Sequence, residues 1–201
     1  SAYLGDDKAY SSYEDSWTNN GETSTDKESA QLKWGNTITA IRWNHMLSNK
    51  VFMNTTLRYS KYRFLVGADS EFTTTTAGSS TTDAFSYAYI SGIEDWSGKV
   101  DFDWVPNPNH FVRFGAGDIY HTYTPGVNQF RVTESNSSAI DTTFGANKQF
   151  AHELFAYLED EVKIGEKFKG NVGLHFSGFV VGSTNYWSLQ PRISGRYLLN
   201  N

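Results

Sequence analysis

The chain contains no cysteine, which excludes a disulfide framework and a thiolate metal site. It has no basic excess either. Its formal net charge of -5 argues against nucleic-acid binding, because a phosphate-binding surface needs positive charge. No run approaches the roughly 18 apolar residues that a transmembrane helix needs. Residues 1–10 show no basic segment followed by an apolar core, so no signal peptide is visible; if the mature protein is exported, its signal has been removed or lies upstream.

Catalytic and cofactor motifs are also missing. The histidines form no H-E-x-x-H pair, no G-x-S-x-G nucleophile motif occurs, and Gly115-Ala116-Gly117 is a lone G-x-G. Two carboxylate pairs at i, i+2 spacing could serve a glycosidase, but a charged lumen is their ordinary interpretation. We therefore predict no enzyme, no cofactor and no metal site, and assign no ligand-binding residue. The carboxylate pairs are Asp101/Asp103 and Glu159/Glu161, and the histidines are His45, His110, His121, His152 and His175.

The pattern that is present is an alternation of apolar and polar residues, clearest in residues 151–199. Period-two alternation predicts strands with one apolar and one polar face. Aromatic residues make up 16% of the chain while its mean hydropathy is only -0.52, as alternation allows. The predicted lipid-facing positions include Leu174, Ile193 and Tyr197. The predicted lumen-facing positions include Glu159, His175, Arg192 and Arg196.

Seven strands are expected, in an all-β antiparallel up-and-down arrangement. They are residues 31–43, a strand beginning at Val51, residues 85–104, a strand carrying Val112 to Tyr120, residues 151–164, and one strand on each side of the loop at 181–186. The expected connections alternate between short ones near 45–50, 106–110 and 165–167 and longer ones near 1–30, 67–84, 125–150 and 180–187. This sorting is typical of a transmembrane barrel, which has short turns at one end and long loops at the other.

The domain organisation follows from these connections. We expect residues 1–30 to form an irregular extracellular loop and residues 31–201 to form a segment of a transmembrane barrel. Trp34 and Trp43 are nine steps apart, or roughly 21 Å for a strand tilted by about 45°, close to a lipid-facing band about 25 Å tall. Aromatics beside the short turns and toward the long loops would form two girdles. The first set is Trp43, Phe52, Trp104, Phe111 and Phe168, and the second is Trp34, Tyr59, Tyr62, Tyr87, Tyr89, Tyr120, Tyr123, Phe179 and Trp187.

Three acidic residues fall on the face assigned outward, namely Glu94, Asp118 and Asp160. A charge in the middle of a bilayer costs several kcal/mol and costs less near an interface. We therefore expect Asp118 and Asp160 to lie near the rims of the apolar band or to pair with neighbouring strands.

Three segments resemble TonB-dependent outer-membrane receptors: residues 155–162 (FAYLEDEV), 171–174 (NVGL) and 186–194 (YWSLQPRIS). Members of that family often show a Y-x-E-D-E strand, a G-L-R strand and a P-R strand in this order. His175 stands where the arginine of the second usually falls. Residues 43–45, 59–64 and 93–114 look like earlier strands of the Bacteroidetes-type branch.

The resemblance implies a barrel of about 22 strands with a plugged lumen, so seven strands would be a fragment without plug, TonB box or closing strand. It implies location in the outer membrane of a Gram-negative bacterium and import of a nutrient such as an iron chelate, cobalamin, a glycan or a peptide. The implied partners are outer-membrane lipid, the TonB complex, and surface lipoproteins or other outer-membrane subunits. Two alternatives stay open: a structural or scaffold barrel in an outer-membrane complex, and a soluble carbohydrate-binding β-domain.

Overall fold

The computed structural model describes residues 1–135, 137 and 139–199, and these residues form nine β-strands. No membrane-spanning helix is found among the described residues. The strands are β1 (Ala2–Asn19), β2 (Glu22–Ser48), β3 (Val51–Thr76), β4 (Ser79–Asn107), β5 (His110–Thr133), β6 (Ile140–Gly145), β7 (Gln149–Ile164), β8 (Phe168–Val181) and β9 (Thr184–Tyr197).

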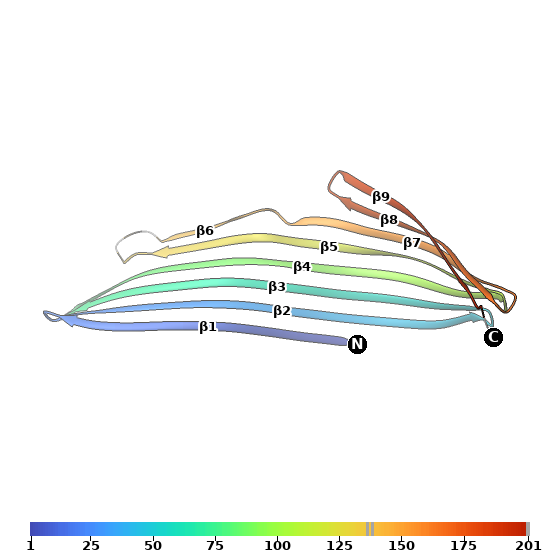
Figure 1. Cartoon of the computed structure of the whole chain (residues 1–201). Helices are drawn as coiled ribbons and strands as arrows, with labels where there is room; N and C mark the ends of the chain where they lie inside the picture. Colours follow the sequence, from blue (N-terminus) through green and yellow to red (C-terminus); the bar gives the residue numbers. More distant parts are fainter. Residues whose placement is uncertain (136, 138, 200–201) are drawn as a thin grey trace.

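All nine strands belong to one antiparallel sheet in the order β1-β2-β3-β4-β5-β7-β8-β9, with β6 paired to β5 (Figure 1). On β5, residues 110–123 pair with β7 and residues 127–132 pair with β6. Strands β6 and β7 therefore follow one another along the same edge of β5. The predicted all-β, up-and-down arrangement is confirmed, and the seven predicted strands correspond to β2, β3, β4, β5, β7, β8 and β9.

The expectation that residues 1–30 form an irregular loop is wrong. Strands β1 and β2 pair from Ala2 opposite Thr39 to Asn19 opposite Glu22, and close in a tight turn at Asn20 and Gly21. Both turn residues have positive φ, 48° and 82°, as a two-residue hairpin turn requires. Hydroxyl groups also hydrogen-bond across the two strands. Ser16 Oγ lies 2.9 Å from Thr25 Oγ1, and Thr18 Oγ1 lies 2.9 Å from Thr23 Oγ1. Polar composition here does not prevent strand formation.

The long loops expected at 67–84 and 125–150 are mostly strand in their described residues, which do not include 136 and 138, and the loop expected at 180–187 is a turn at 182–183 between β8 and β9. Strand β3 continues to Thr76 and β4 begins at Ser79, and the turn between them contains Gly78 at φ 101°. Threonine is β-branched and favours strands, and its hydroxyls bond across this hairpin, for example between Thr73 and Thr82 at 3.0 Å. The Thr- and Ser-rich composition therefore marks an extended hairpin rather than a loop. The short connections predicted at 45–50, 106–110 and 165–167 do contain the turns.

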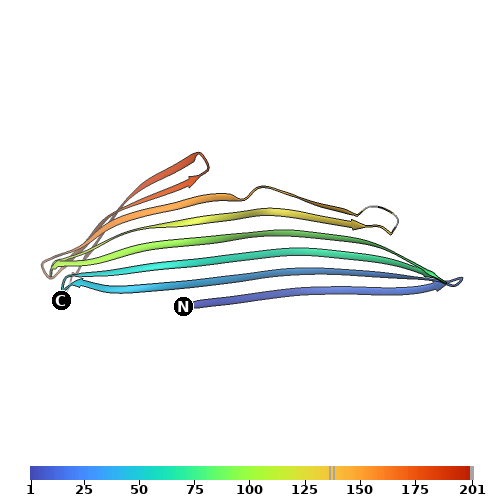
Figure 2. The same ribbon diagram turned by 180° about the vertical axis from the view of Figure 1, so that it is seen from behind.

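The sheet is a single curved and twisted layer, as Figures 1 and 2 show from opposite sides. Among the described residues the buried hydrophobic residue is Ala151 alone. The accessible surface of 13732 Å² exceeds the about 9,500 Å² expected for a compact folded chain of 22.6 kDa. The described residues therefore contain no second sheet of the kind that a soluble sandwich needs to cover an apolar face.

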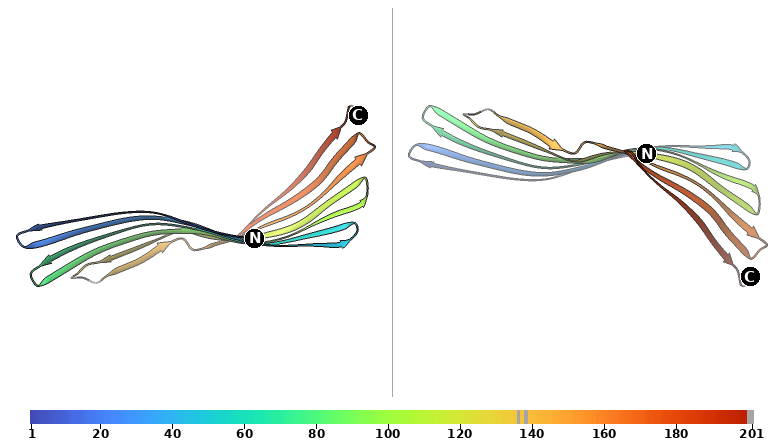
Figure 3. Two further views of the ribbon diagram at one scale, coloured as in Figure 1. Left: turned by 90° about the horizontal axis from the view of Figure 1, so that it is seen from below. Right: turned by 90° about the horizontal axis from the view of Figure 1, so that it is seen from above.

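The four strands β2 to β5 are much longer than β8 and β9. They have 24 to 29 residues, while β8 and β9 have 14 each. Seen from below and from above, in Figure 3, the strands converge near the middle of the sheet and fan out toward its two ends. We call the part bounded by the turns at 49–50, 108–109 and 165–167 the near half, and the part bounded by the turns at 20–21 and 77–78 the far half.

Candidate functional site

The strand register decides which side chains share a face of the sheet, because directly paired residues project to the same side. One such row runs across the near half from β2 to β9. Its members are His45, Met53, Phe102, Phe114, Leu158, Leu174 and Pro191. We call this side the Phe102 face and the opposite side, which carries His121, the His121 face.

The Phe102 face is apolar throughout the near half, and we call this surface the apolar band. Its large side chains are strongly exposed, Ile193 by 84%. Among the described residues of the band, the Asp, Glu, Lys and Arg side chains are Asp118 and Asp160 alone. Leu174, Ile193 and Tyr197 lie on this face, as expected. Other members are Ile41, Trp43, Val51, Leu57, Trp96, Val100, Trp104, Val112, Leu154, Ala156, Val162, Ile164, Phe168, Val172, Phe176, Val180, Trp187 and Leu189.

The His121 face of the near half is polar and charged. Glu159 lies 3.4 Å from Arg113 and 3.7 Å from Arg192, and Lys169 lies 2.6 Å from Glu161. The residues predicted to line a lumen, Glu159, His175, Arg192 and Arg196, all lie on this face. It also carries Arg42, Arg58, Lys99, Asp101, Asp103 and Lys163.

In the far half the two faces exchange character. The Phe102 face becomes predominantly charged, and the His121 face becomes predominantly aromatic and aliphatic. On the Phe102 face the far half carries Asp6, Lys8, Glu14, Lys27, Lys33, Lys61, Arg63, Asp69, Glu71, Glu94, Arg131 and Asp141. On the His121 face it carries Tyr13, Trp17, Leu32, Trp34, Tyr62, Phe64, Val66, Phe72, Phe85, Tyr87, Tyr89, Tyr123, Phe130, Val132 and Phe144.

The exchange is sharp on the Phe102 face. The row Tyr59, Trp96 and Tyr120 ends the apolar band, and the next row carries Lys61 and Glu94. The rings of Tyr59 and Trp96 are 4.6 Å apart between centroids. Aromatic side chains and charges thus meet within one step of the strand pleat, about 7 Å.

A bulge in β5 moves its far-half side chains to the faces that match this exchange of polarity. Opposite the interval from Ile90 to Gly92 on β4, strand β5 has one extra residue between Thr124 and Val127. One extra residue moves all following side chains to the other face. Phe130 and Val132 therefore lie on the aromatic side of the far half instead of among its charges.

The three misplaced acidic residues are all paired with neighbouring strands, which confirms the expectation for Asp118 and Asp160. Asp160 Oδ2 lies 2.7 Å from His110 Nδ1, and Asp118 Oδ2 lies 2.8 Å from His152 Nδ1. The first pair lies beside the turn at 108–109 and the second beside the Tyr120 row, so they mark the two edges of the apolar band.

The third residue, Glu94, lies just beyond the band and pairs with Lys61 at 2.9 Å. The hydrogen bond between the two raises the pKa of Lys61 and lowers the pKa of Glu94, because each group stabilises the charged form of the other.

The residues of the two predicted aromatic girdles do not share one face of the sheet. Trp34 and Trp43 are an odd number of residues apart and lie on opposite faces, so their spacing measures no band. The residues of the two predicted girdles that lie on the His121 face are Phe52, Phe111, Trp34, Tyr62, Tyr87, Tyr89, Tyr123 and Phe179. The measure that holds is within β4, where Trp96 and Trp104 share the Phe102 face. Their eight steps span about 26 Å along the strand and about 19 Å at a 45° tilt.

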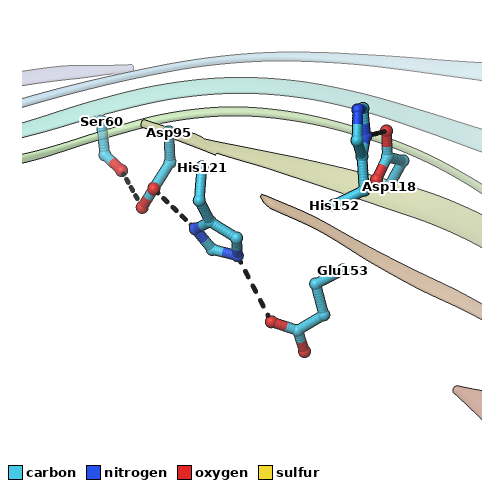
Figure 4. Close-up of polar contacts among 6 residues, drawn as sticks. All are labelled: Ser60, Asp95, Asp118, His121, His152 and Glu153. Atoms are coloured by element: carbon cyan, nitrogen blue, oxygen red, sulfur yellow. Dashed lines mark hydrogen bonds and ion pairs between the residues drawn. The ribbon is translucent and has the colours of Figure 1, made fainter. Parts of the chain in front are cut away.

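A polar cluster on the His121 face resembles a catalytic triad in composition (Figure 4). Ser60 Oγ donates to Asp95 Oδ2 at 3.2 Å, and Asp95 Oδ1 lies 2.8 Å from His121 Nδ1. His121 Nε2 lies 3.5 Å from Glu153 and not beside the serine. A triad needs the imidazole next to the nucleophile to take its proton, and here the carboxylate separates the two.

The arrangement therefore ties β3, β4, β5 and β7 together and activates no nucleophile. Asp95 and His121 are 26 residues apart, and only the strand register brings them together, so the sequence does not predict their pairing. Among the described residues no group of three His, Cys, Asp or Glu side chains could hold a metal ion.

No protein-family model and no curated protein matches the chain. Several solved outer-membrane proteins are similar to it in structure. The ferripyoverdine receptor of Pseudomonas aeruginosa has 8% sequence identity and a TM-score of 0.41, covering 99% of this chain and 40% of the receptor. The outer-membrane transporter YddB of Escherichia coli has 10% identity and a TM-score of 0.39, covering 96% of this chain and 36% of YddB. The siderophore receptor PirA of Pseudomonas aeruginosa has 12% identity and a TM-score of 0.34, covering 96% and 37%.

The chain thus spans about 40% or less of the length of these structures, which are described as receptors and a transporter. With TM-scores below 0.5, the similarities carry no conclusion about ligand or transport. The assignment to a Bacteroidetes-type branch stays a prediction.

Proposed function

We propose that this chain forms part of the wall of an outer-membrane β-barrel, with the apolar band in the bilayer and the far half projecting beyond it. The observation that supports this most is the exchange of polarity between the two faces. A barrel wall meets lipid on its outer side only within the bilayer, and water on that side above it. A covering sheet in a soluble sandwich would bury one face along its whole length and would not produce such an exchange.

The strand lengths agree with this placement. Strand β4 has 29 residues, or about 96 Å along the strand and about 68 Å along the barrel axis at a 45° tilt. The hydrocarbon core is about 30 Å thick and takes only 9–11 residues of a tilted strand. More than half of β4 then lies outside the bilayer.

The free-energy cost of placing charged side chains in lipid indicates which face of the sheet is turned toward the bilayer. A lysine or arginine at the bilayer midplane costs about 2–4 kcal/mol. Turning the His121 face to lipid would place Arg58, Lys99 and Arg192 there, whereas the Phe102 face offers two histidine-paired aspartates at its edges. The Phe102 face is therefore the lipid side, and the His121 face lines the lumen.

The function proposed for the whole protein is TonB-dependent import of a nutrient across the outer membrane of a Gram-negative bacterium. The strand motifs at 155–162, 171–174 and 186–194 support it. The ligand would be an iron chelate, cobalamin, a glycan or a peptide. The TonB complex would act through parts of the protein outside this chain, and surface lipoproteins are further candidate partners. We would examine residues 67–84 and the described residues of 125–150 for ligand contacts, and most of these lie on strands β3 to β6 in the far half.

Two measurements on the whole protein test this proposal. The first is fractionation: the protein should be in the outer membrane and should need detergent for extraction. If it is soluble and monomeric without detergent, the membrane proposal fails. The second is uptake of labelled iron chelate, cobalamin, glycan and peptide by a deletion strain. Loss of one uptake supports import, while unchanged uptake together with co-purifying membrane subunits supports the scaffold alternative.

A further inference from the structure

A hollow of about 550 Å³ opens in the sheet directly beyond the aromatic row Tyr59, Trp96 and Tyr120. Its floor on the Phe102 face is set by two glycines. Gly35 and Gly92 flank Arg63 in the register of β2, β3 and β4. A Cβ on Gly92 would come within 2.6 Å of the Tyr62 carbonyl oxygen, and one on Gly35 would meet the Asp6 carboxylate. Side chains at these positions would fill the hollow.

The hollow is positively charged, although the chain as a whole carries -5. Five basic and three acidic residues line it, which leaves a net charge of +2. The basic residues are Lys8, Lys33, Lys61, Arg63 and Lys148, and the acidic residues are Asp6, Asp7 and Glu94. We call this site the basic hollow.

Two of the basic side chains already have carboxylate partners. Arg63 Nη2 lies 3.1 Å from Asp6 Oδ1, and Lys61 Nζ lies 2.9 Å from Glu94 Oε2. Among the described residues no carboxylate lies within 4.0 Å of the other three ammonium groups, those of Lys8, Lys33 and Lys148. These groups remain available to an anion, for which three donors on a compact ammonium are well suited.

The hollow is also apolar on one side. Leu65 and Ile90 pair across β3 and β4 and line it together with the backbone of the two glycines. Toward the near half, the hollow ends at Lys61 and Glu94, which lie one row from Tyr59 and Trp96 at the edge of the apolar band. A ligand that lies in the hollow and extends along the band must be anionic at one end and apolar at the other.

We propose that the basic hollow binds the phosphate-bearing headgroup of an anionic lipid, whose acyl chains lie along the apolar band. The inference rests on the proposed function in one respect, that the band lies in the bilayer. Basic side chains at a membrane surface attract anionic lipid by about 1 kcal/mol each. Aromatic rows lie at the same level, where headgroups begin.

The test uses the whole protein in detergent, with bisphosphorylated lipid A as the probe and its dephosphorylated form as the matched lipid. Native mass spectrometry counts bound lipid. The variant is Lys33→Gln/Arg63→Gln in the basic hollow. The control is Lys27→Gln/Arg131→Gln, which removes the same charge from the same face of the far half, away from the hollow. In each double variant the arginine has an aspartate partner, Asp6 or Asp141.

We expect bisphosphorylated lipid A to bind the parent and the control equally, and the hollow variant about 30-fold more weakly, which corresponds to about 2 kcal/mol for two charges. Equal binding by all three proteins, or equal binding of the dephosphorylated lipid, overturns the proposal. So does inorganic phosphate that displaces the lipid, because the site would then recognise free phosphate.

Membrane insertion separates the two proposals. Protection of the barrel from protease in vesicles is measured on the same variants. If all variants insert and lipid binding is unchanged, the basic hollow is not a lipid site while the proposed function stands. If the parent protein does not insert into vesicles, the proposed function is wrong, and the lipid site, which depends on it, is wrong as well.

Discussion

The substitution Leu174→Lys tests the lipid side of the wall at its least ambiguous point. Leu174 lies at the centre of the apolar run of β8, from Phe168 to Val180, and its register partners are Leu158 and Pro191. Its side chain is exposed by 44%, so the lysine has room and steric overlap contributes little. The neighbouring residue His175 lies on the opposite face, and His175→Lys is the matched control.

The expected effect follows from where each ammonium group would lie. At the bilayer midplane a lysine costs about 2–4 kcal/mol. In a wet lumen, beside Tyr157 and Gln190, the same group at the half-buried position 175 keeps its contact with water and avoids this cost. We therefore expect Leu174→Lys to be less stable than His175→Lys by about 2–4 kcal/mol.

The assay is denaturant unfolding of the whole protein in lipid vesicles, followed by the mobility shift that folded barrels show without heating. The shift in midpoint multiplied by the slope gives the difference in free energy. Equal destabilisation by the two substitutions, or a larger effect of His175→Lys, would refute the assignment of the faces.

Three further outcomes are expected. A double-mutant cycle with Asp118→Ala, His152→Ala and the double variant in vesicles should give a coupling energy of about 1–3 kcal/mol, because loss of one partner leaves the other unpaired at the edge of the apolar band. Additive effects of the two single substitutions would contradict the pairing. Because the folded-state pKa of Glu94 is lowered, its stabilising contribution is present at neutral pH and is lost as the pH falls through that pKa. Glu94→Gln should therefore lower the free energy of unfolding by less than about 1 kcal/mol at pH 7 and leave it unchanged in acid, and a loss that does not depend on pH would contradict this. Deletion of Gly126 should remove the bulge in β5 and turn Phe130 to the charged face of the far half. Amide hydrogen exchange in β5 beyond the deletion should then be faster, and unchanged exchange would contradict the register.

Alternation alone was sufficient to predict the near half. It placed Leu174 and Ile193 on the face opposite His175 and Arg192, and the structure agrees. In the near half one face of each strand is apolar and the other is polar, so the residues alternate in polarity along the sequence with the period of two that strands have. Asp118 and Asp160, which broke the pattern, were expected at the rims or paired with a neighbouring strand, but the partner itself, His110 for Asp160, is given only by the structure.

The far half was predicted poorly because its composition is typical of loops. Threonine, serine and glycine around residues 67–84 suit exposed turns, and they also suit a hairpin solvated on one side. The exchange of faces was hidden for a second reason. In β5 the bulge shifts the alternation by one residue, and no local pattern distinguishes this shift from an irregular segment. The cluster of Ser60, Asp95 and His121 was missed because its members lie far apart in sequence.

The most direct test of the account measures the exchange of environment along a single strand. The chain has no cysteine, so single spin labels at Leu57 and Glu71 are specific within it. Both positions lie on the Phe102 face of β3, fourteen residues apart, or about 33 Å along the barrel axis at a 45° tilt. In vesicles the account predicts that the label at Leu57 is relaxed by oxygen and shielded from a water-soluble nickel chelate, while the label at Glu71 shows the reverse. The same environment at both positions would contradict it.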